Sequence, residues 1–238
     1  MGVNIGNKAL KDAYIGDKPI KQIYLGDKLL WQKYEYIQDG LVFQLDCADY
    51  NPTLNTWVDK IGGVSFAMSN VTVDSLGGVV FNGTNSKGVA SVGLNNPVNT
   101  STIEVAIYVR ANKSQFVLES GVYNTIMYGF HNSTTTCLCN MSNTTKYYNT
   151  IPITTGFIAN SVHYGSSPAN IVNGNVGSFA SSGTYWSKNG SVAYLGARSN
   201  NAANYYMNGI IYQIRIYNRL LTADEMIRNQ RIDMQKYI

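Results

Sequence analysis

From residue 40 onward the chain is a succession of short apolar segments separated by turns rich in Gly, Asn and Ser. In TIEVAIYVR (102–110) and IIYQIRIY (210–217), apolar and polar residues alternate, which is the pattern of a strand with one buried face. Many short strands at this spacing indicate an antiparallel sandwich or jelly roll. The other segments are GLVFQLDC (40–47), VSFAM (64–68), GVVFNG (78–83), QFVLES (115–120), IMYGF (126–130), SVHYG (161–165) and VAYLGAR (192–198).

The end of the chain predicts a helix. In LTADEMIRNQRIDMQKY (221–237), Thr222 is an expected N-cap and Glu225 occupies the capping-box position three residues later. The apolar positions are Leu221, Met226, Ile227 and Met234. We therefore expect an all-β, antiparallel jelly-roll β-sandwich with a short C-terminal helix over residues 36–238.

The first 34 residues contain a ten-residue repeat, IGNKALKDAY, IGDKPIKQIY and LGDKLLWQKY (5–34). Gly-Asn and Gly-Asp are favourable two-residue hairpin turns, because both positions tolerate positive φ. Each block is then a turn of two residues and a strand of eight. In a simple meander Ile15 pairs with Lys18 and Tyr14 pairs with Pro19.

In such a meander, equivalent residues of successive blocks point to opposite faces, because cross-strand partners share a face. Both faces then carry apolar and tyrosine side chains, and three strands cannot bury two faces alone. We expect residues 1–35 to be an attachment or oligomerisation segment, completed by other copies or by a partner; a small sheet lying on the main domain is the alternative. The candidate residues are Tyr14, Ile15, Ile20, Ile23, Tyr24, Leu25, Leu30 and Trp31.

The charge and hydropathy of the chain argue against nucleic acid and membranes as partners. The net charge of +4 arises mainly in the opening segment, and the remainder lacks the Arg-containing basic patch with interleaved aromatics of a nucleic-acid interface. No apolar run approaches the roughly 20 residues of a membrane span. MGVNIGNKALKDAY lacks the apolar region of a signal peptide. We therefore expect no nucleic-acid partner, no membrane insertion, and synthesis in a cytoplasm without a signal peptide.

The cysteines do not indicate a disulfide framework or a zinc site. Cys47, Cys137 and Cys139 lack C-x-x-C spacing, and His131 and His163 add too few ligands for zinc. We expect three buried or half-buried thiols.

Several segments together resemble concanavalin A-like, laminin-G-like jelly rolls over residues 40–238. They are GLVFQLDCADY, NTWVDKIGGVSFAM, GGVVFNGTNSKGV, TIEVAIYV and NGIIYQIRIYNRLLTADEMIRNQRIDMQKY. In this arrangement Trp57 would anchor the core, Asn82-Gly83 would form a hairpin turn, and Arg215 would alternate outward.

The resemblance extends to function. Such domains occur in bacterial surface proteins and phage virion proteins, and the opening repeat resembles N-terminal segments of phage tail and capsid-associated proteins. It implies a virion structural protein, which would be a head or tail fibre or a capsid decoration protein on the virion surface. This protein would contact other virion proteins through the repeat and display a lectin-like domain that attaches to host or mucosal glycans. A homo-oligomer is implied, with a trimer favoured. A bacterial cell-surface adhesin or a carbohydrate-binding module is the alternative.

The acidic residues argue against one enzyme class. Glucanases of this superfamily use paired carboxylates in an E-x-D-x-x-E run, so that one acts as acid and the other as nucleophile. Neither Glu104 nor Glu119 is followed by such a partner. We therefore expect that the chain is not an enzyme and has no catalytic residues, with a glycoside hydrolase as the less favoured reading.

A glycan-binding site would use exposed aromatics that stack on sugar rings and amides that fix the hydroxyls. Loops 141–150, 184–191 and 198–209 carry such residues, although aromatics covering the sandwich edge would have the same pattern. The candidates are Tyr147, Tyr148, Tyr185, Trp186, Asn200, Asn201, Asn204, Tyr205 and Tyr206. No cofactor is indicated with certainty. A calcium ion would draw on Asp46, Asp49 or Asp59, so the metal stays open.

Overall fold

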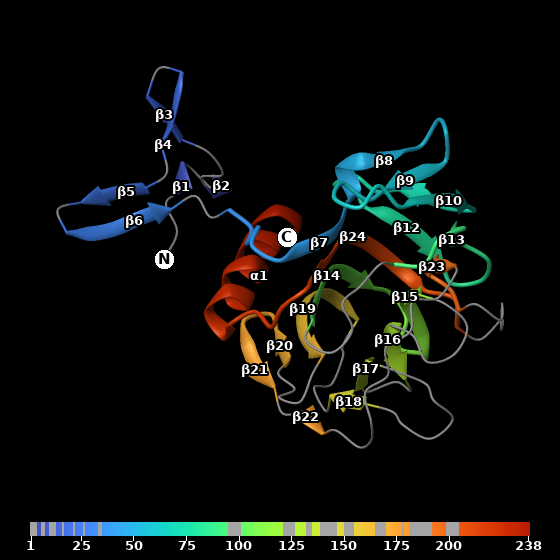
Figure 1. Ribbon diagram of the computed structural model, residues 1–238. Coiled ribbons are helices and arrows are strands. Elements are labelled where there is room, and N and C mark those ends of the chain that lie inside the picture. Colours follow the sequence, from blue (N-terminus) through green and yellow to red (C-terminus); the bar gives the residue numbers. More distant parts are fainter. Residues whose placement is uncertain are drawn as a thin grey trace.

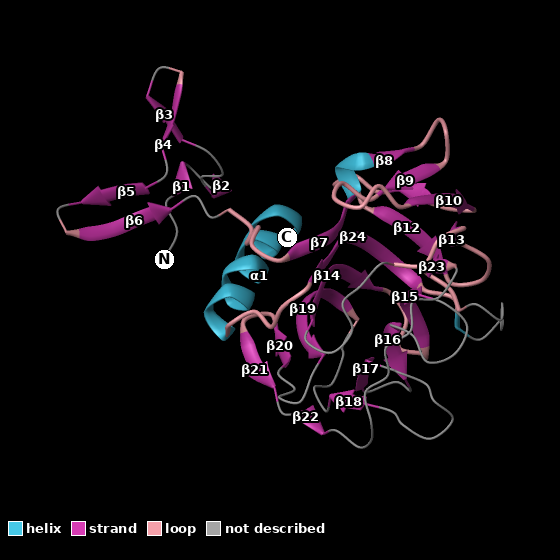
Figure 2. Ribbon diagram, viewed as in Figure 1, coloured by secondary structure: helices cyan, strands magenta, loops and turns pink. Residues whose placement is uncertain are grey.

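The computed structural model is mostly strand, with a single long helix among the residues it describes (Figures 1 and 2). Those residues are 4–5, 8–9, 13–15, 17–20, 22–25, 27–32, 35–94, 101–120, 127–131, 135–138, 147–149, 155–164, 170–177, 179–180, 192–198 and 205–238. Two antiparallel sheets face one another across a shared core, so the prediction of an all-β sandwich with a C-terminal helix is confirmed.

The first sheet has ten strands. In spatial order it consists of β22 (Phe179–Ala180), β18 (Tyr147–Asn149), β17 (Thr135–Leu138), β16 (Met127–His131), β15 (Gln115–Ser120), β23 (Ala193–Leu195), β13 (Lys87–Ala90), β10 (Ser65–Ser69), β9 (Thr56–Val58) and β8 (Tyr50–Asn51). A 3-10 turn, η1 (Cys47–Asp49), leads into β8.

The second sheet has eight strands. It consists of β11 (Thr72–Val73), β12 (Val79–Asn82), β24 (Asn208–Tyr217), β14 (Ser101–Val109), β19 (Gly156–Tyr164), β20 (Asn170–Val172) and β21 (Asn175–Gly177), with β7 (Leu41–Asp46) also paired to β24. Its central strand β14 shows how the sequence selects the two faces. Ile103, Val105 and Ile107 point into the core, and the residues between them point to the outer face.

The core between the sheets is built from large apolar side chains of both. Trp57, Phe66 and Phe81 are completely buried, and the Trp57 indole Nε1 donates a hydrogen bond to the Asp46 carbonyl at 2.8 Å. The expectation that Trp57 anchors the core is therefore confirmed. Cys47 is also buried, as expected; Cys137 lies in β17, and Cys139 lies outside the described residues.

The helix α1 (Ala223–Tyr237) lies across the outer face of the eight-stranded sheet (Figure 1). It begins as predicted: the Thr222 hydroxyl accepts from the Glu225 amide, and the Glu225 carboxylate accepts from the Thr222 amide at 2.8 Å. Met226 packs with Tyr217 and Ile171 of the sheet. The helix thereby covers polar side chains that strand alternation alone would leave in solvent.

The Asn82-Gly83 turn is present but does not join a hairpin. Gly83 has φ +80°, and the Asn82 side chain accepts from the amides of Thr84 and Asn85. However, β12 pairs in the eight-stranded sheet and β13 pairs in the ten-stranded one. The turn therefore carries the chain from one layer to the other, a distinction that turn chemistry cannot make.

The N-terminal repeat forms three separate hairpins, which stand away from the sandwich (Figure 1). They are β1 (Asn4–Ile5) with β2 (Lys8–Ala9), β3 (Ala13–Ile15) with β4 (Lys18–Ile20), and β5 (Gln22–Leu25) with β6 (Lys28–Gln32). The predicted register is correct, since Ile15 pairs with Lys18 and Tyr14 with Pro19. The eight-residue strand is not, because β4 and β5 belong to different two-stranded sheets, so the argument from a continuous meander does not hold.

Candidate functional site

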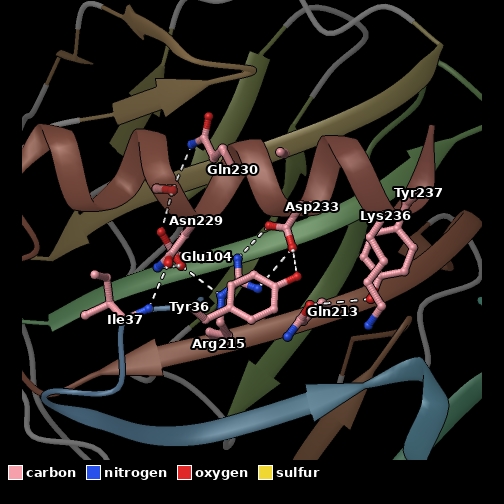
Figure 3. Close-up of polar contacts among 12 residues, drawn as sticks. Tyr36, Ile37, Glu104, Gln213, Arg215, Asn229, Gln230, Asp233, Lys236 and Tyr237 are labelled. Atoms are coloured by element: carbon pink, nitrogen blue, oxygen red, sulfur yellow. Dashed lines mark hydrogen bonds and ion pairs between the residues drawn. The ribbon is translucent and has the colours of Figure 1, made fainter. Parts of the chain in front are cut away.

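The largest group of buried charges lies between α1 and the eight-stranded sheet (Figure 3). The Arg215 guanidinium on β24 donates through Nε to Glu104 Oε2 at 2.9 Å. Its other nitrogens donate to both carboxylate oxygens of Asp233 on α1, at 3.0 and 2.6 Å. Arg215 alternates outward from the sandwich core, as expected, and α1 covers it completely on that face.

The linker that follows the hairpins closes this cluster. The Tyr36 hydroxyl donates to Asp233 Oδ1 at 2.8 Å, and the Tyr36 ring lies 4.2 Å from the Arg215 guanidinium carbon (Figure 3). The amide of Ile37 donates to the Asn229 side chain at 3.0 Å. Residues 36 and 37 therefore belong to the packing of the helix on the sheet.

The electrostatics of the cluster favour a structural role. Burial, and next the charge of Asp233, raises the pKa of Tyr36, so the phenol keeps its proton and acts as a donor. Burial lowers the pKa of Arg215, but the negative charges of Asp233 and Glu104 outweigh it and raise the pKa overall. The cation is permanent and its hydrogen bonds are used within the protein. A substrate has no route to these atoms while Arg215, Glu104 and Asp233 remain fully buried.

The aspartates considered for calcium are engaged in local structure. The Asp59 carboxylate accepts from the amides of Gln44 at 2.7 Å and Gly62 at 2.7 Å. Asp46 lies 2.9 Å from the Lys236 ammonium, and Asp49 lies 2.9 Å from that of Lys60. Within the described part of the chain, no three His, Cys, Asp or Glu side chains form a group that could hold a metal ion.

An aromatic and cationic cluster lies on the outer face of the ten-stranded sheet. Phe116 on β15 and Tyr205 meet edge to face, with ring centroids 5.6 Å apart. The Arg198 guanidinium carbon lies 5.8 Å from the Phe116 ring centroid and 5.4 Å from that of Tyr205. Tyr205 and Arg198 are half-buried, so parts of both reach the surface.

A bulge in β15 places Phe116 on this face. Leu118 pairs with the core residue Tyr128, whereas Phe116 pairs with its neighbour Gly129, which points the other way. The Phe116 ring lies over Gly129, where an added Cβ would come within 2.8 Å of it. The absence of a side chain at Gly129 therefore leaves room for the Phe116 ring to pack against the sheet.

The structure brings one predicted glycan-binding residue, Tyr205, into this cluster. Tyr206 is 9% exposed and belongs to the packed interior, while Tyr147 and Tyr148 lie in β18. The remaining candidates, Tyr185, Trp186, Asn200, Asn201 and Asn204, lie outside the described residues.

Sequence reasoning missed Phe116 and Arg198. Phe116 stands in an apolar strand and was indistinguishable from core, because no local signal marks the bulge. Arg198 directly precedes the Asn-rich loop and could have been noticed there.

The predicted attachment residues lie in the hairpins. Tyr24 is 52% and Leu25 is 70% exposed, whereas Ile20 and Ile23 are half-buried. Tyr14 and Ile15 lie in β3, and Leu30 and Trp31 lie in β6.

No protein-family model matches the chain, and no curated protein matches it. Solved structures do share its fold. Trypanosoma rangeli sialidase is 15% identical with a TM-score of 0.62, covering 92% of this chain and 36% of the sialidase. The same sialidase in complex with sialic acid is 14% identical with a TM-score of 0.58, covering 87% and 35%. The binding domain of botulinum neurotoxin serotype D/C is 12% identical with a TM-score of 0.59, covering 83% and 53%.

At these identities the likeness shows the fold alone. The chain spans about a third of the length of the sialidase and about half that of the neurotoxin chain. Within the described residues, no helix is both long and apolar enough to cross a lipid bilayer.

The prediction that the chain is not an enzyme is contradicted, because sialidases are among the structures that share its fold. The reason lies in the pattern on which that prediction rested. Paired carboxylates on one strand identify one catalytic arrangement, and sialidases depart from it by using a tyrosine nucleophile. The missing E-x-D-x-x-E run therefore does not exclude glycoside hydrolysis.

Proposed function

We propose that the sandwich is a carbohydrate-binding module whose site surrounds Tyr205 on the outer face of the ten-stranded sheet. The observation that carries this proposal is the Arg198–Phe116–Tyr205 cluster, which presents a partly exposed ring and cation on a rigid sheet. A similar fold occurs in a protein described as a sialidase in complex with sialic acid, which supports a carbohydrate ligand.

The chemistry of the cluster suits a sugar. The apolar face of a pyranose ring stacks on an aromatic ring, and a guanidinium donates hydrogen bonds to sugar oxygens. Because Phe116 and Arg198 hold the Tyr205 ring in place, little conformational entropy would be lost on binding.

A glycan array of the full chain tests this function. We expect the wild-type chain to bind a subset of glycans, Tyr205→Ala to lose about tenfold in affinity through the missing stacking, and Tyr205→Phe to retain binding. Leu54→Ala is the matched control, since Leu54 is exposed elsewhere on the surface. Equal binding by Tyr205→Ala and wild type would rule out this site, and no binding to any glycan would rule out the function.

Glycoside hydrolysis is the second candidate, and the fold shared with sialidases favours it. Release of the fluorophore from a 4-methylumbelliferyl sialoside by the purified chain would support it. A rate no higher than that of heat-denatured protein would count against it for this substrate class.

The three hairpins would attach the module to a larger assembly. Two-stranded hairpins are marginal alone, and Tyr24 and Leu25 expose apolar surface on one of them. A virion is the assembly that the sequence resemblance suggests, with the sandwich displayed toward host glycans and a trimer as the expected oligomer.

A further inference from the structure

The helix α1 leaves part of the eight-stranded sheet's outer face uncovered. Its last turn ends at Tyr237, whose ring stacks on that of Tyr212 with centroids 4.5 Å apart. Beyond Tyr212 a row of paired positions crosses five strands on this face. The row consists of Thr72, Val80, Ile210, Tyr108 and Phe157.

Tyr108, between Ile210 and Phe157, is the exposed aromatic residue of this row, which we call the Tyr108 shelf. Its side chain is 40% exposed, whereas Phe157 and Val80 in the same row are half-buried and Ile210 is buried. The Phe157 ring lies 6.2 Å from the Tyr212 ring, so the shelf continues the aromatic packing at the end of the helix.

Hydrogen bonds to Asp74 hold the Tyr212 ring in this packing. The Tyr212 hydroxyl donates to Asp74 Oδ2 at 2.8 Å, and Asp74 Oδ1 accepts from the amide of Gly78 at 2.6 Å. These hydrogen bonds fix the Tyr212 ring, against which Phe157 of the shelf packs.

Polar groups flank the shelf on the same face. Arg110 follows Tyr108 by two residues, and Asn208 precedes Ile210 by two residues, so both lie on the face of the shelf. The Arg110 amide donates to the Asn208 carbonyl at 3.0 Å. Arg110 is exposed and Asn208 is half-exposed.

The size of the shelf decides between a small ligand and a second copy of the chain. A tyrosine side chain buries about 150–250 Å² when fully covered, so Tyr108 offers roughly 100 Å² or less. A stable protein interface needs about 800 Å² from each partner. One sugar ring matches the area that is exposed.

We propose that the Tyr108 shelf is a second carbohydrate-binding surface, on the sheet opposite to the Tyr205 site. A pyranose ring stacks on Tyr108, and the side chains of Arg110 and Asn208 donate to its hydroxyls. This inference rests on the proposed carbohydrate-binding function. It makes the module bivalent, because the two surfaces lie on opposite outer faces and cannot contact the same ring.

Affinity electrophoresis of the full chain tests the shelf, in gels containing soluble xylan, galactomannan, mixed-linkage β-glucan or dextran. At least one polymer should retard the wild type. We expect Tyr108→Ala to raise the dissociation constant about tenfold and Tyr108→Phe to leave it unchanged. Val73→Ala is the control, since Val73 is exposed on β11 but lies outside the row that forms the shelf.

The same gels with Tyr205→Ala separate this inference from the proposed function. Weaker retardation with Tyr108→Ala supports the shelf, whatever Tyr205→Ala does. Retardation weakened by Tyr205→Ala alone overturns the shelf and leaves the Tyr205 site standing. A wild type that no polymer retards, or variants that are both retarded as strongly as the wild type, would overturn both sites. A lower molecular mass of Tyr108→Ala in solution would assign the shelf to a second copy of the chain.

Discussion

Arg215 shows that a local pattern can predict the face of a strand on which a residue lies without predicting its burial. It alternates away from the core in β24, and the sequence gives no reason to bury a guanidinium there. Arg215 is buried because the helix that follows β24 packs over it, and Asp233 on that helix accepts two hydrogen bonds from its guanidinium. Long-range pairing of this kind is not encoded in the spacing of neighbouring residues.

We predict that Arg215→Met lowers the free energy of unfolding by about 3–5 kcal/mol, because Glu104 and Asp233 would remain buried without their cation. Guanidinium denaturation of the full chain measures this. Arg231→Met, at an exposed position of the same helix, should change stability by less than about 0.5 kcal/mol. Similar losses in the two variants would contradict a structural role for the cluster.

Glu225 gives the helix start a defined pH dependence. The hydrogen bonds from Arg219, at 2.9 and 2.7 Å, and from the Thr222 amide hold the pKa of Glu225 at about 2, below its ordinary value of 4.5. Because the folded-state pKa is lowered, this stabilisation is complete above 4.5 and is lost as the pH falls toward about 2.

The unfolding free energies of wild type and Glu225→Gln, compared between pH 6 and pH 2, measure this effect. We expect the wild type to be more stable at pH 6 and the difference to shrink below pH 4.5. A difference that is independent of pH would contradict the ion pair as its cause.

At the scale of the element, the local sequence predicted where strands, turns and the helix form better than it predicted which strands pair. The strand segments, the Thr222 capping box and the pairing of Ile15 with Lys18 all depend on neighbours within a few residues, and the structure contains each. The layer change at Gly83 and the bulge at Phe116 depend on which distant strand pairs on each side. For the same reason the Arg198–Phe116–Tyr205 cluster, which joins three separate segments, could be predicted only at Tyr205.

Substitutions at two glycines distinguish the cost of backbone strain from the cost of steric overlap. Gly196 and Gly174 have φ +66° and +78°, but an added Cβ at Gly196 would overlap the ring of the buried Phe81, whereas nothing lies within 4 Å of one at Gly174. We predict a loss of about 1 kcal/mol for Gly174→Ala from strain alone and about 1–3 kcal/mol more for Gly196→Ala. Thermal unfolding by calorimetry compares them, and equal shifts in Tm would show that Phe81 does not confine this turn.

At the scale of the whole molecule, the chain combines a sandwich with three hairpins that stand away from it (Figure 1). The hairpin sequence contains Ile, Leu, Tyr and Trp side chains as well as charged ones, and Leu25 is exposed to solvent. If the hairpins serve oligomerisation, the mass in solution should depend on them.

Light scattering on the wild-type chain and on the Tyr24→Asp, Leu25→Asp double variant tests this dependence. We expect the wild type at three times its monomer mass of 26.2 kDa and the double variant at a lower mass. A monomeric wild type would remove self-association and leave attachment to a different protein as the role of the hairpins.

Nuclear magnetic resonance mapping of the bound glycan tests carbohydrate binding by the sandwich most directly. The glycan bound most strongly on the array would be titrated into ¹⁵N-labelled full-length protein, with backbone amide shifts followed. We predict saturable shifts at residues 115–118, 193–198 and 205–207, around Tyr205. Shifts confined to residues 4–32, or the absence of saturable shifts in the sandwich, would contradict it.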